Sequence, residues 1–313
     1  MRLKPCTLCG GEQYELYLGR VYAYEDQVFD LVRCDSCGLV RVAPLPDPET
    51  ARAFYDRRYF DSDFSCGVRK GSYLETDASR VGEYREILDI IEKYRPSGRL
   101  LEVGCAAGSF LNYARRAGYE VEGVDVSEWA AGAAREQFGL NVHVGRLVET
   151  GLPDEDFDIV FLGDLLEHEP EPLEFLAEVK RVTKPQGMVV IKVPTYVNSF
   201  YYRTARLLPI SWTLGRLDVR LLQALKLSRE GEPLPPYHLY EYSLDTLSRM
   251  LQKSGFRTID HRTSLLVPEF LGDEEAGVMD RLTHFGFRAL RFFVKSFNLP
   301  AGHVMVLAVK RKG

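Results

Sequence analysis

Residues 100–110, Leu-Leu-Glu-Val-Gly-Cys-Ala-Ala-Gly-Ser-Phe, constrain the fold of this chain more than any other stretch. An apolar run meets Gly104, small residues follow at 106 and 108, and helically spaced apolar residues continue to Gly118. This order predicts a strand, a tight turn and a helix. Small residues let the backbone of such a turn approach a ligand, and the start of a helix offers unpaired N–H groups to an anion. We therefore expect a ligand site at this turn.

A carboxylate at a defined distance indicates that the ligand contains a ribose. Residues 120–125 read as a second strand that ends on Asp125, 21 residues after Gly104. An acid at about that distance is placed to accept hydrogen bonds from the two ribose hydroxyls, as in dinucleotide sites. The small residues do not have the phase of Gly-x-Gly-x-x-Gly, so the turn does not fit the dinucleotide fingerprint.

Further strands and helices alternate along the chain. Ser127 caps a predicted helix that ends at Gly139, and Pro172 opens another that ends near residue 182. Further strands are expected at residues 141–144, 156–162, 188–193, 256–263 and 303–309. This alternation predicts an α/β fold with helices on both faces of a largely parallel sheet.

The motif at residues 102–108, Glu-x-Gly-x-Ala-x-Gly, resembles motif I of the class I S-adenosylmethionine (SAM) methyltransferases, with Ala106 in place of the middle glycine. Residues 157–193 resemble the segment that follows motif I in that family. The resemblance covers residues 97–313. It implies a Rossmann-like seven-stranded methyltransferase sheet with an antiparallel last strand, and transfer of a methyl group from SAM.

The resemblance also implies which residues hold the cofactor. The turn would receive the amino-acid carboxylate of SAM, Glu102 would pair with its ammonium, and Asp125 would take the ribose hydroxyls. Val126 would pack on the adenine. The full implied set is Glu102, Gly104, Cys105, Ala106, Gly108, Asp125, Val126, Arg146, Leu147, Leu162, Gly163 and Asp164.

The segment Asp164-Leu-Leu-Glu-His168 follows the fourth strand, where the methyl group would emerge. Three interpretations stay open. Glu167 and His168 begin the next helix and serve the structure alone, or His168 takes a proton from a substrate hydroxyl. In the third, Asp164, Glu167 and His168 hold a divalent metal such as Mg²⁺, because the spacing resembles metal-using O-methyltransferases of quinone biosynthesis and RNA end modification.

A second histidine is a candidate for the same chemistry. Residues 237–243, Tyr-His-Leu-Tyr-Glu-Tyr-Ser, resemble a segment common to the subfamily. His238 in this segment either approaches the acceptor or makes an anchoring hydrogen bond. The candidate catalytic residues are therefore His168, Glu167 and His238.

Two Cys-x-x-Cys-Gly knuckles near the N-terminus predict a metal site. The pairs are Cys6 with Cys9 and Cys34 with Cys37, and 24 residues separate them. Four thiolates favour tetrahedral Zn²⁺ with no open coordination position, which indicates a structural ion. The residues between the pairs alternate enough to predict a hairpin. We expect a zinc ribbon that serves as a substrate lid, as a docking module or as structural support.

These features divide the chain into three parts. We expect a zinc ribbon at 1–45, a linker and helical cover of the SAM pocket at 46–96, and a methyltransferase domain at 97–313 with a lid insertion at 195–240. In the cover, helices are expected at 49–59 and 73–95. Four aromatics there either line the sulfonium or pack ordinarily: Tyr55, Tyr59, Phe60 and Tyr73.

Composition limits the partners. The net charge of −5 lacks the basic excess of a nucleic-acid-binding surface, so no nucleic acid is expected. No apolar run is long enough to span a bilayer and the N-terminus lacks a signal-peptide core, so the cytoplasm is the expected location. Within residues 200–230, leucines at 214, 217, 221 and 225 predict the apolar face of a helix. This face packs on the domain or on a second copy in a homodimer, or the region touches a membrane surface peripherally.

The sequence thus predicts a zinc-bearing, SAM-dependent methyltransferase that acts on an oxygen of a small molecule or a glycan. Two alternatives stay open. One is a nucleotide-sugar C-methyltransferase, and the other is a SAM-binding regulator or scaffold without catalysis.

Overall fold

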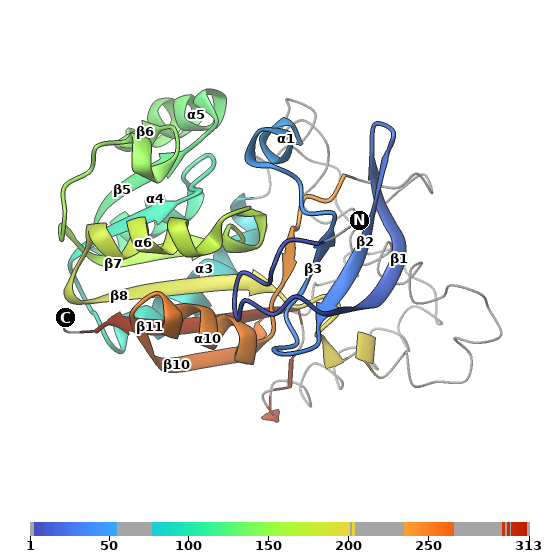
Figure 1. The fold of residues 1–313 in the computed structure, drawn as a ribbon. Coiled ribbons are helices and arrows are strands. Elements are labelled where there is room, and N and C mark those ends of the chain that lie inside the picture. The colour runs from blue at the N-terminus through green and yellow to red at the C-terminus, as the bar shows by residue number, and fades with distance from the viewer. Residues whose placement is uncertain are drawn as a thin grey trace, which may run out of the picture.

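A seven-stranded mixed sheet forms the centre of the molecule (Figure 1). The computed structural model describes residues 3–54, 77–200, 202–203, 235–265, 296–297, 299–300 and 302–311. The sheet has the order β10-β11-β8-β7-β4-β5-β6. Its strands are β4 (Arg99–Val103), β5 (Glu120–Asp125), β6 (Val142–Val144), β7 (Phe157–Gly163), β8 (Thr183–Pro194), β10 (Phe256–Leu265) and β11 (His303–Lys310).

The strand directions agree with the expected, largely parallel sheet and its antiparallel last strand. Neighbours from β6 to β8 pair in parallel, whereas β11 runs antiparallel to both β8 and β10. The predicted seven-stranded sheet and its antiparallel last strand are therefore confirmed. The parallel strands place their carboxyl ends at one edge, and the amino end of β11 joins them there.

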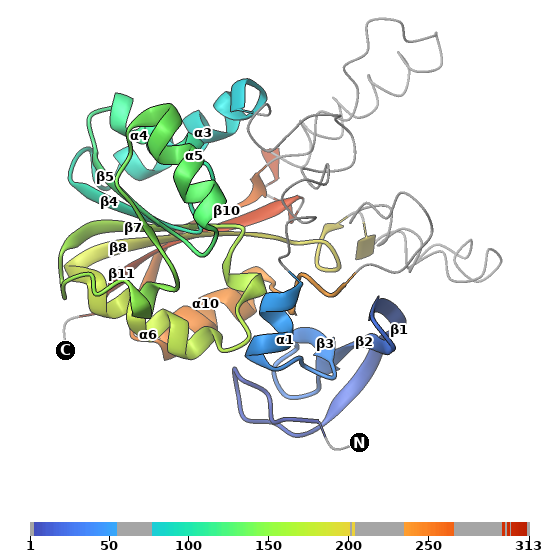
Figure 2. The same cartoon turned by 90° about the horizontal axis from the view of Figure 1, so that it is seen from above.

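Helices cover both faces of this sheet (Figure 2). One face carries α3 (Asp77–Glu92), α4 (Ser109–Arg116) and α5 (Glu128–Phe138), and the other carries α6 (Pro172–Val182) and α10 (Leu244–Lys253). Side chains alternate across a strand, so adjacent residues of β4 pack into different cores. Leu100 packs beneath α3, α4 and α5, and Leu101 packs beneath α6 and α10. Both leucines are fully buried.

Local sequence signals set most helix ends. The Ser127 side chain accepts a hydrogen bond from the Ala130 amide at 3.2 Å, and Gly139 ends α5 in the left-handed conformation. One boundary differs from the expectation of a helix that ends near residue 182 and a strand that starts at residue 188. β8 begins at Thr183, directly after α6, and its pairing with β7 shifts register before Ile159. Residues 184–187 therefore form a β-bulge within β8.

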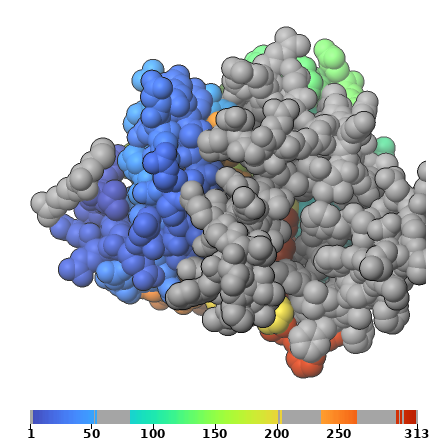
Figure 3. Space-filling view, turned by 90° about the vertical axis from the view of Figure 1, so that its right-hand side faces the viewer, coloured from blue at the N-terminus to red at the C-terminus, as the bar shows by residue number. Residues whose placement is uncertain are grey.

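The N-terminal segment forms a separate four-stranded sheet of order β1-β2-β3-β9. Its strands are β1 (Tyr14–Tyr24), β2 (Gln27–Cys34), β3 (Val40–Ala43) and β9 (Tyr240–Glu241). The hairpin of β1 and β2 confirms the prediction, but the fourth strand comes from the end of the predicted lid insertion. We call the body formed by residues 3–43 the ribbon, which appears in Figure 3 as a contiguous blue block.

The ribbon is joined to the main domain through its core. Its buried residues belong to the same apolar cluster as those beneath α6 and α10, including Leu31 of the ribbon and Leu247 of α10. The linker continues into α1 (Pro48–Ala53), which starts at the predicted place.

Several predictions concern residues outside the described ranges. These are the four cover aromatics and most of the 195–240 insertion, including the helix expected within residues 200–230. Among the described helices, none combines the length and apolar character that a membrane crossing requires.

Candidate functional site

The turn between β4 and α4 has the left-handed backbone that its small residues allow. The φ angles are 75° at Gly104, 46° at Ala106 and 77° at Gly108. A Cβ at Gly108 would lie 2.5 Å from Leu140 Cδ1, so only glycine fits there. The amide of Gly104 donates to the Val124 carbonyl at 2.8 Å, which ties the turn to β5.

The turn is also tied to the carboxylate that ends β5. The Ala106 amide donates to Asp125 Oδ2 at 2.7 Å, and the Ser127 amide donates to Oδ1 at 2.9 Å. Burial raises the pKa of Asp125, and the two amide hydrogen bonds oppose that effect. Each oxygen keeps a second lone pair with which it can accept a hydroxyl.

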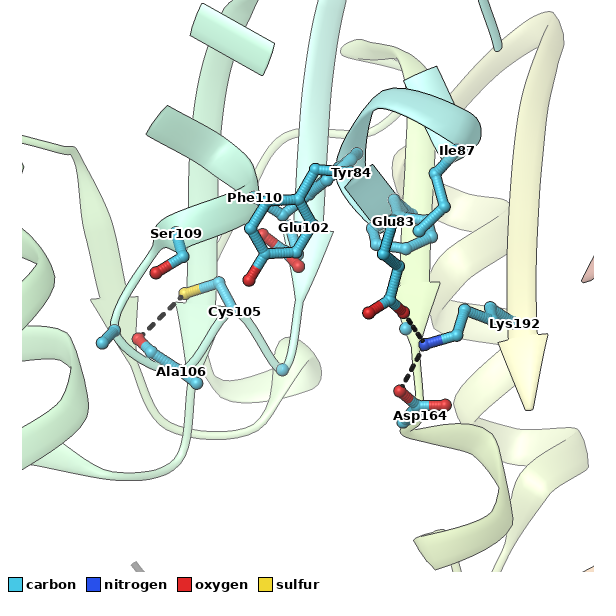
Figure 4. A pocket seen from close by; sticks show the side chains of 14 residues that line it. Glu83, Tyr84, Ile87, Glu102, Cys105, Ala106, Ser109, Phe110, Asp164 and Lys192 are labelled. Carbon is cyan, nitrogen blue, oxygen red and sulfur yellow. Dashed lines mark hydrogen bonds and ion pairs between the residues drawn. The ribbon is translucent and has the colours of Figure 1, made fainter. Parts of the chain in front are cut away.

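A pocket of about 560 Å³, partly open to solvent, lies over this turn (Figure 4). The turn and the ends of β4, β7 and β8 form its base, and α3 closes it with Glu83, Tyr84 and Ile87. The Tyr84 ring meets the Phe110 ring edge-on at 5.9 Å between centroids. Helix α3, at residues 77–92, thus contributes one wall of the pocket.

One end of the pocket carries an ionic network centred on the buried Lys192. Lys192 Nζ lies 2.5 Å from Glu83 Oε1 and 2.6 Å from Asp164 Oδ2, as Figure 4 shows. His303 Nε2 is 3.2 Å from the other oxygen of Asp164. Asp164 itself has a φ of 54°, an uncommon value for a non-glycine residue. Strained backbone of this kind clusters at functional sites.

Beyond Asp164, a carboxylate and two imidazoles converge. Glu167, His168 and His238 each offer one ligand atom within 4.8 Å of the others. Glu167 and His168 belong to the single turn η2 (Leu166–His168), whereas His238 comes from the segment before β9. The His168 ring meets the His238 ring edge-on at 4.7 Å.

Burial governs the charge of Glu167. Glu167 is only 1% exposed, and both carboxylate oxygens are without a hydrogen-bond partner among the described residues. Burial raises its pKa well above the usual value, the charge of Asp164 adds to that effect, and Lys192 opposes it. His168 Nδ1 lies 2.8 Å from the Tyr237 carbonyl oxygen. Because a carbonyl oxygen only accepts hydrogen bonds, Nδ1 carries the proton. The neutral ring then presents its lone pair at Nε2.

The four predicted cysteine ligands form a second cluster. The Sγ atoms of Cys6 and Cys37 lie 3.5 Å apart, those of Cys9 and Cys34 lie 3.6 Å apart, and all four are within 4.8 Å of one another. None of the four forms a disulfide. The two knuckle glycines are left-handed, with φ near 76° at Gly10 and 75° at Gly38.

Comparison with known protein families decides the identity of the main domain. The family described as "Methyltransferase domain" matches residues 76–261, which is more than half of the chain. The chain belongs to this methyltransferase family.

Two curated relatives each match a smaller share of the chain than the family does. A Mycolicibacterium smegmatis protein described as a probable S-adenosylmethionine-dependent methyltransferase is 25% identical over 169 residues, 53% of this chain and 55% of that protein. A Methylococcus capsulatus protein named ubiquinone biosynthesis O-methyltransferase is 33% identical over 97 residues, 29% of this chain and 41% of that protein. The chain thus spans about half the length of these curated relatives, or less.

A solved structure supports the fold alone. A chain in the complex that contains the Haloferax volcanii Trm112 methyltransferase activator is 15% identical, with a TM-score of 0.51, and the match covers 76% of this chain and 95% of that chain.

The methyltransferase domain brings about half of the expected cofactor residues to the pocket wall. These are Glu102, Gly104, Cys105, Ala106, Gly163 and Asp164. Leu147 and Leu162 lie instead in the core, at 2% and 0% exposure. Gly108 is the N-cap of α4, Arg146 is the N-cap of the short turn η1 (Leu147–Glu149), and Val126 is largely exposed. Cys105 is buried, which raises the pKa of its thiol.

The sequence did not identify Glu83, Lys192 and His303 as site residues. A signal existed for Lys192, the single charged residue in an otherwise apolar predicted strand. Because a central parallel strand is buried on both faces, a lysine in it needs a buried partner.

Proposed function

We propose that this protein is a SAM-dependent methyltransferase that transfers the methyl group to an oxygen of a small molecule or a glycan. One observation carries the proposal. The methyltransferase pocket ends at Asp164, and three residues later the cluster of the buried Glu167 and the part-buried His168 and His238 begins. Relatives named as O-methyltransferases support an oxygen acceptor.

The pocket suits the charge and shape of SAM. Glu102 would pair with its ammonium, and the first-turn amides of α4 would receive its carboxylate, since they lack partners within the helix. Asp125 would accept the ribose hydroxyls with its remaining lone pairs. Three carboxylates at the pocket, Glu83, Glu102 and Asp164, face one ammonium from Lys192, so a cationic sulfonium is favoured over its neutral product.

The residues of the chain then orient the acceptor against the methyl group. Methyl transfer is an in-line displacement, for which orientation supplies roughly 7–11 kcal/mol of the barrier and a general base about 10²–10⁴ in rate. His168 Nε2 is the candidate base, because the Tyr237 carbonyl fixes the proton on Nδ1. His238 would lie beside the acceptor oxygen, with its ring stacked on Tyr196 at 5.4 Å.

A divalent cation is the second means of activation at the same cluster. Glu167, His168 and His238 would hold it, while Lys192 and His303 engage Asp164, which the sequence had placed in the ligand set. A buried carboxylate without a hydrogen-bond partner among the described residues requires a proton or a cation nearby, which suits both means of activation. When bound, the cation would lower the pKa of an acceptor hydroxyl.

The test separates cofactor binding from chemistry. Calorimetry should detect SAM binding to the wild type and a loss of about tenfold or more in Asp125→Asn. Methyl-labelled SAM, incubated with a small-molecule extract, should transfer label, and His168→Ala should lower the rate at least about tenfold with SAM affinity retained. His143→Ala is the matched control, because His143 lies on β6 at the far edge of the sheet. Absence of SAM binding by the wild type would refute the proposal.

We also propose that the ribbon holds structural zinc. With Zn–S bonds of ~2.3 Å, tetrahedral geometry requires sulfur atoms ~3.8 Å apart, close to the 3.5 Å between Cys6 and Cys37 and the 3.6 Å between Cys9 and Cys34. The turns at Gly10 and Gly38 aim backbone amides at the sulfurs, as the Gly11 amide shows by donating to Cys9 Sγ at 3.4 Å. Bound zinc would supply cross-linking energy to a segment too small for a core of its own.

The domain division follows from the same features. We propose a zinc-binding domain at 1–45 that contains the ribbon, a cover at 46–96, and a methyltransferase domain at 97–313. The insertion at 195–240 returns to the ribbon at its end, since β9 pairs with β3.

A further inference from the structure

Residue Leu239 connects the ribbon to the turn that carries Glu167. Its carbonyl accepts a hydrogen bond from the Val42 amide of the ribbon at 3.0 Å, and its own amide donates to the Glu167 carbonyl at 2.8 Å. One residue therefore joins the edge of the ribbon sheet to η2. Pairing of β3 with β9 continues this contact at Tyr240 and Glu241.

The same segment fixes both imidazoles. The Tyr237 carbonyl accepts from His168 Nδ1 at 2.8 Å, and His238 follows in the chain. Because His238 lies between the residue that fixes His168 and the residue that pairs with the ribbon, its backbone position depends on both. The ring contact of 4.7 Å between the two histidines reflects this placement.

A side-chain contact reaches from the first knuckle to the far side of the cluster. The Tyr240 hydroxyl donates to the Pro170 carbonyl at 3.2 Å and accepts from the Thr7 hydroxyl at 3.1 Å. Thr7 lies between the first two cysteines, and Pro170 lies two residues after η2. Lys253 of α10 holds the knuckle in place by donating to the carbonyls of Thr7 and Leu8 at 3.2 and 2.9 Å.

We propose that the ribbon is a positioning element of the acceptor site, and that Tyr240 is the positioning residue that transmits its rigidity to Glu167, His168 and His238. The proposal rests on the proposed function of that cluster. A strand of two residues has little register of its own, so β9 takes its position from the ribbon. Misplacement of a reacting group by about 1 Å costs about 10²-fold in rate, so small shifts of β9 matter.

The chain offers a matched pair of variants. Tyr242 stacks on Tyr240 with ring centroids 5.8 Å apart, and its buried hydroxyl makes no hydrogen bond with any residue that the structure describes. Tyr240→Phe and Tyr242→Phe therefore remove the same group from adjacent sites. We expect Tyr240→Phe to lower kcat about fivefold or more with SAM affinity within about twofold, and Tyr242→Phe to leave kcat within about twofold.

A spectroscopic measurement makes the test independent of any acceptor. NMR of the imidazole protons in the intact protein should show shifts of His168 and His238 in Tyr240→Phe and none in Tyr242→Phe. His143, at the opposite edge of the sheet, is the internal reference. Thr7→Val removes the hydrogen bond between Thr7 and Tyr240 and keeps the one from Tyr240 to Pro170. It replaces Tyr240→Phe in the test if that variant does not fold.

The outcomes separate the two proposals. A wild type that transfers no methyl group refutes the proposed function but leaves the imidazole shifts readable. Unchanged shifts and unchanged kcat in both Tyr240→Phe and Thr7→Val would overturn the role of the ribbon, as would equal effects in Tyr240→Phe and Tyr242→Phe.

Discussion

Lys192 and Glu83 form an ion pair of 2.5 Å between the end of β8 and the helix that covers the pocket. Lys192 is only 3% exposed and also lies 2.6 Å from Asp164. One ammonium thus links helix α3, strand β8 and Asp164, which lies three residues before Glu167. The position of α3 over the pocket depends on this link.

Replacing Lys192 should destabilise the fold strongly. Lys192→Met leaves the carboxylates of Glu83 and Asp164 facing each other, and loss of one partner from a buried pair costs about 3–5 kcal/mol. Lys184→Met is the control on the same strand, because its pair with Asp158 at 2.8 Å is about one-third exposed and contributes about 1 kcal/mol or less. Urea unfolding measures both. Similar losses in the two variants would contradict the structural assignment of Lys192.

Replacing Ala106 by glycine should stabilise the protein. Ala106 adopts a φ of 46° where the family motif has glycine. Left-handed backbone costs a non-glycine residue about 1–2 kcal/mol. Glycine also loses more conformational entropy on folding, which offsets roughly half of that gain. The expected net stabilisation is roughly 0.5–1 kcal/mol. Ala107→Gly, at a neighbour without positive φ, should lose stability. Thermal unfolding decides, and a loss in Ala106→Gly would disprove the assigned strain.

The stability of the protein should depend on the charge of Glu167. Its pKa is raised in the folded state, so folding favours the protonated form. The protein should therefore lose stability progressively as the pH rises above about 4.3, the ordinary pKa of a glutamate. Glu167→Gln stays neutral. Its stability advantage over the wild type should therefore grow as the pH rises above about 4.3, by up to about 1.4 kcal/mol per pH unit.

Added Mg²⁺ or Mn²⁺ distinguishes the two means of activation at this cluster. A cation held there would stabilise the wild type at the higher pH and leave Glu167→Gln unaffected. If the cation leaves both proteins unchanged, the general base alone remains. A stability difference that stays flat with pH would contradict the raised pKa.

Zinc content should follow the cysteine cluster. Wild-type protein should contain about one zinc ion per chain, and Cys9→Ser should lose it, because four thiolates complete the tetrahedral set. Cys105→Ala should keep its zinc, since Cys105 lines the pocket and lies outside the cluster. Elemental analysis of purified protein measures both. Equal zinc in all three proteins would exclude the cluster as the binding site.

Local signals in the sequence determined the fold of the main domain. The run before Gly104, the strand that ends on Asp125 and the cap at Ser127 all lie where local propensity and hydrophobic pattern place them. The antiparallel last strand came from the family resemblance and not from periodicity. Spacing also identified the four cysteines, because two Cys-x-x-Cys turns each aim a pair of sulfurs at one point.

Only the tertiary structure decided which polar groups meet at the site. Glu83, Asp164, Lys192 and His303 come from four separate elements, and no spacing along the chain relates them. Likewise the partners of Glu167 and His168 include His238, some seventy positions later, while Asp164, three residues away, turns toward Lys192. Sequence patterns report local geometry, whereas contacts between elements depend on the register of pairing, such as that of β9 with β3.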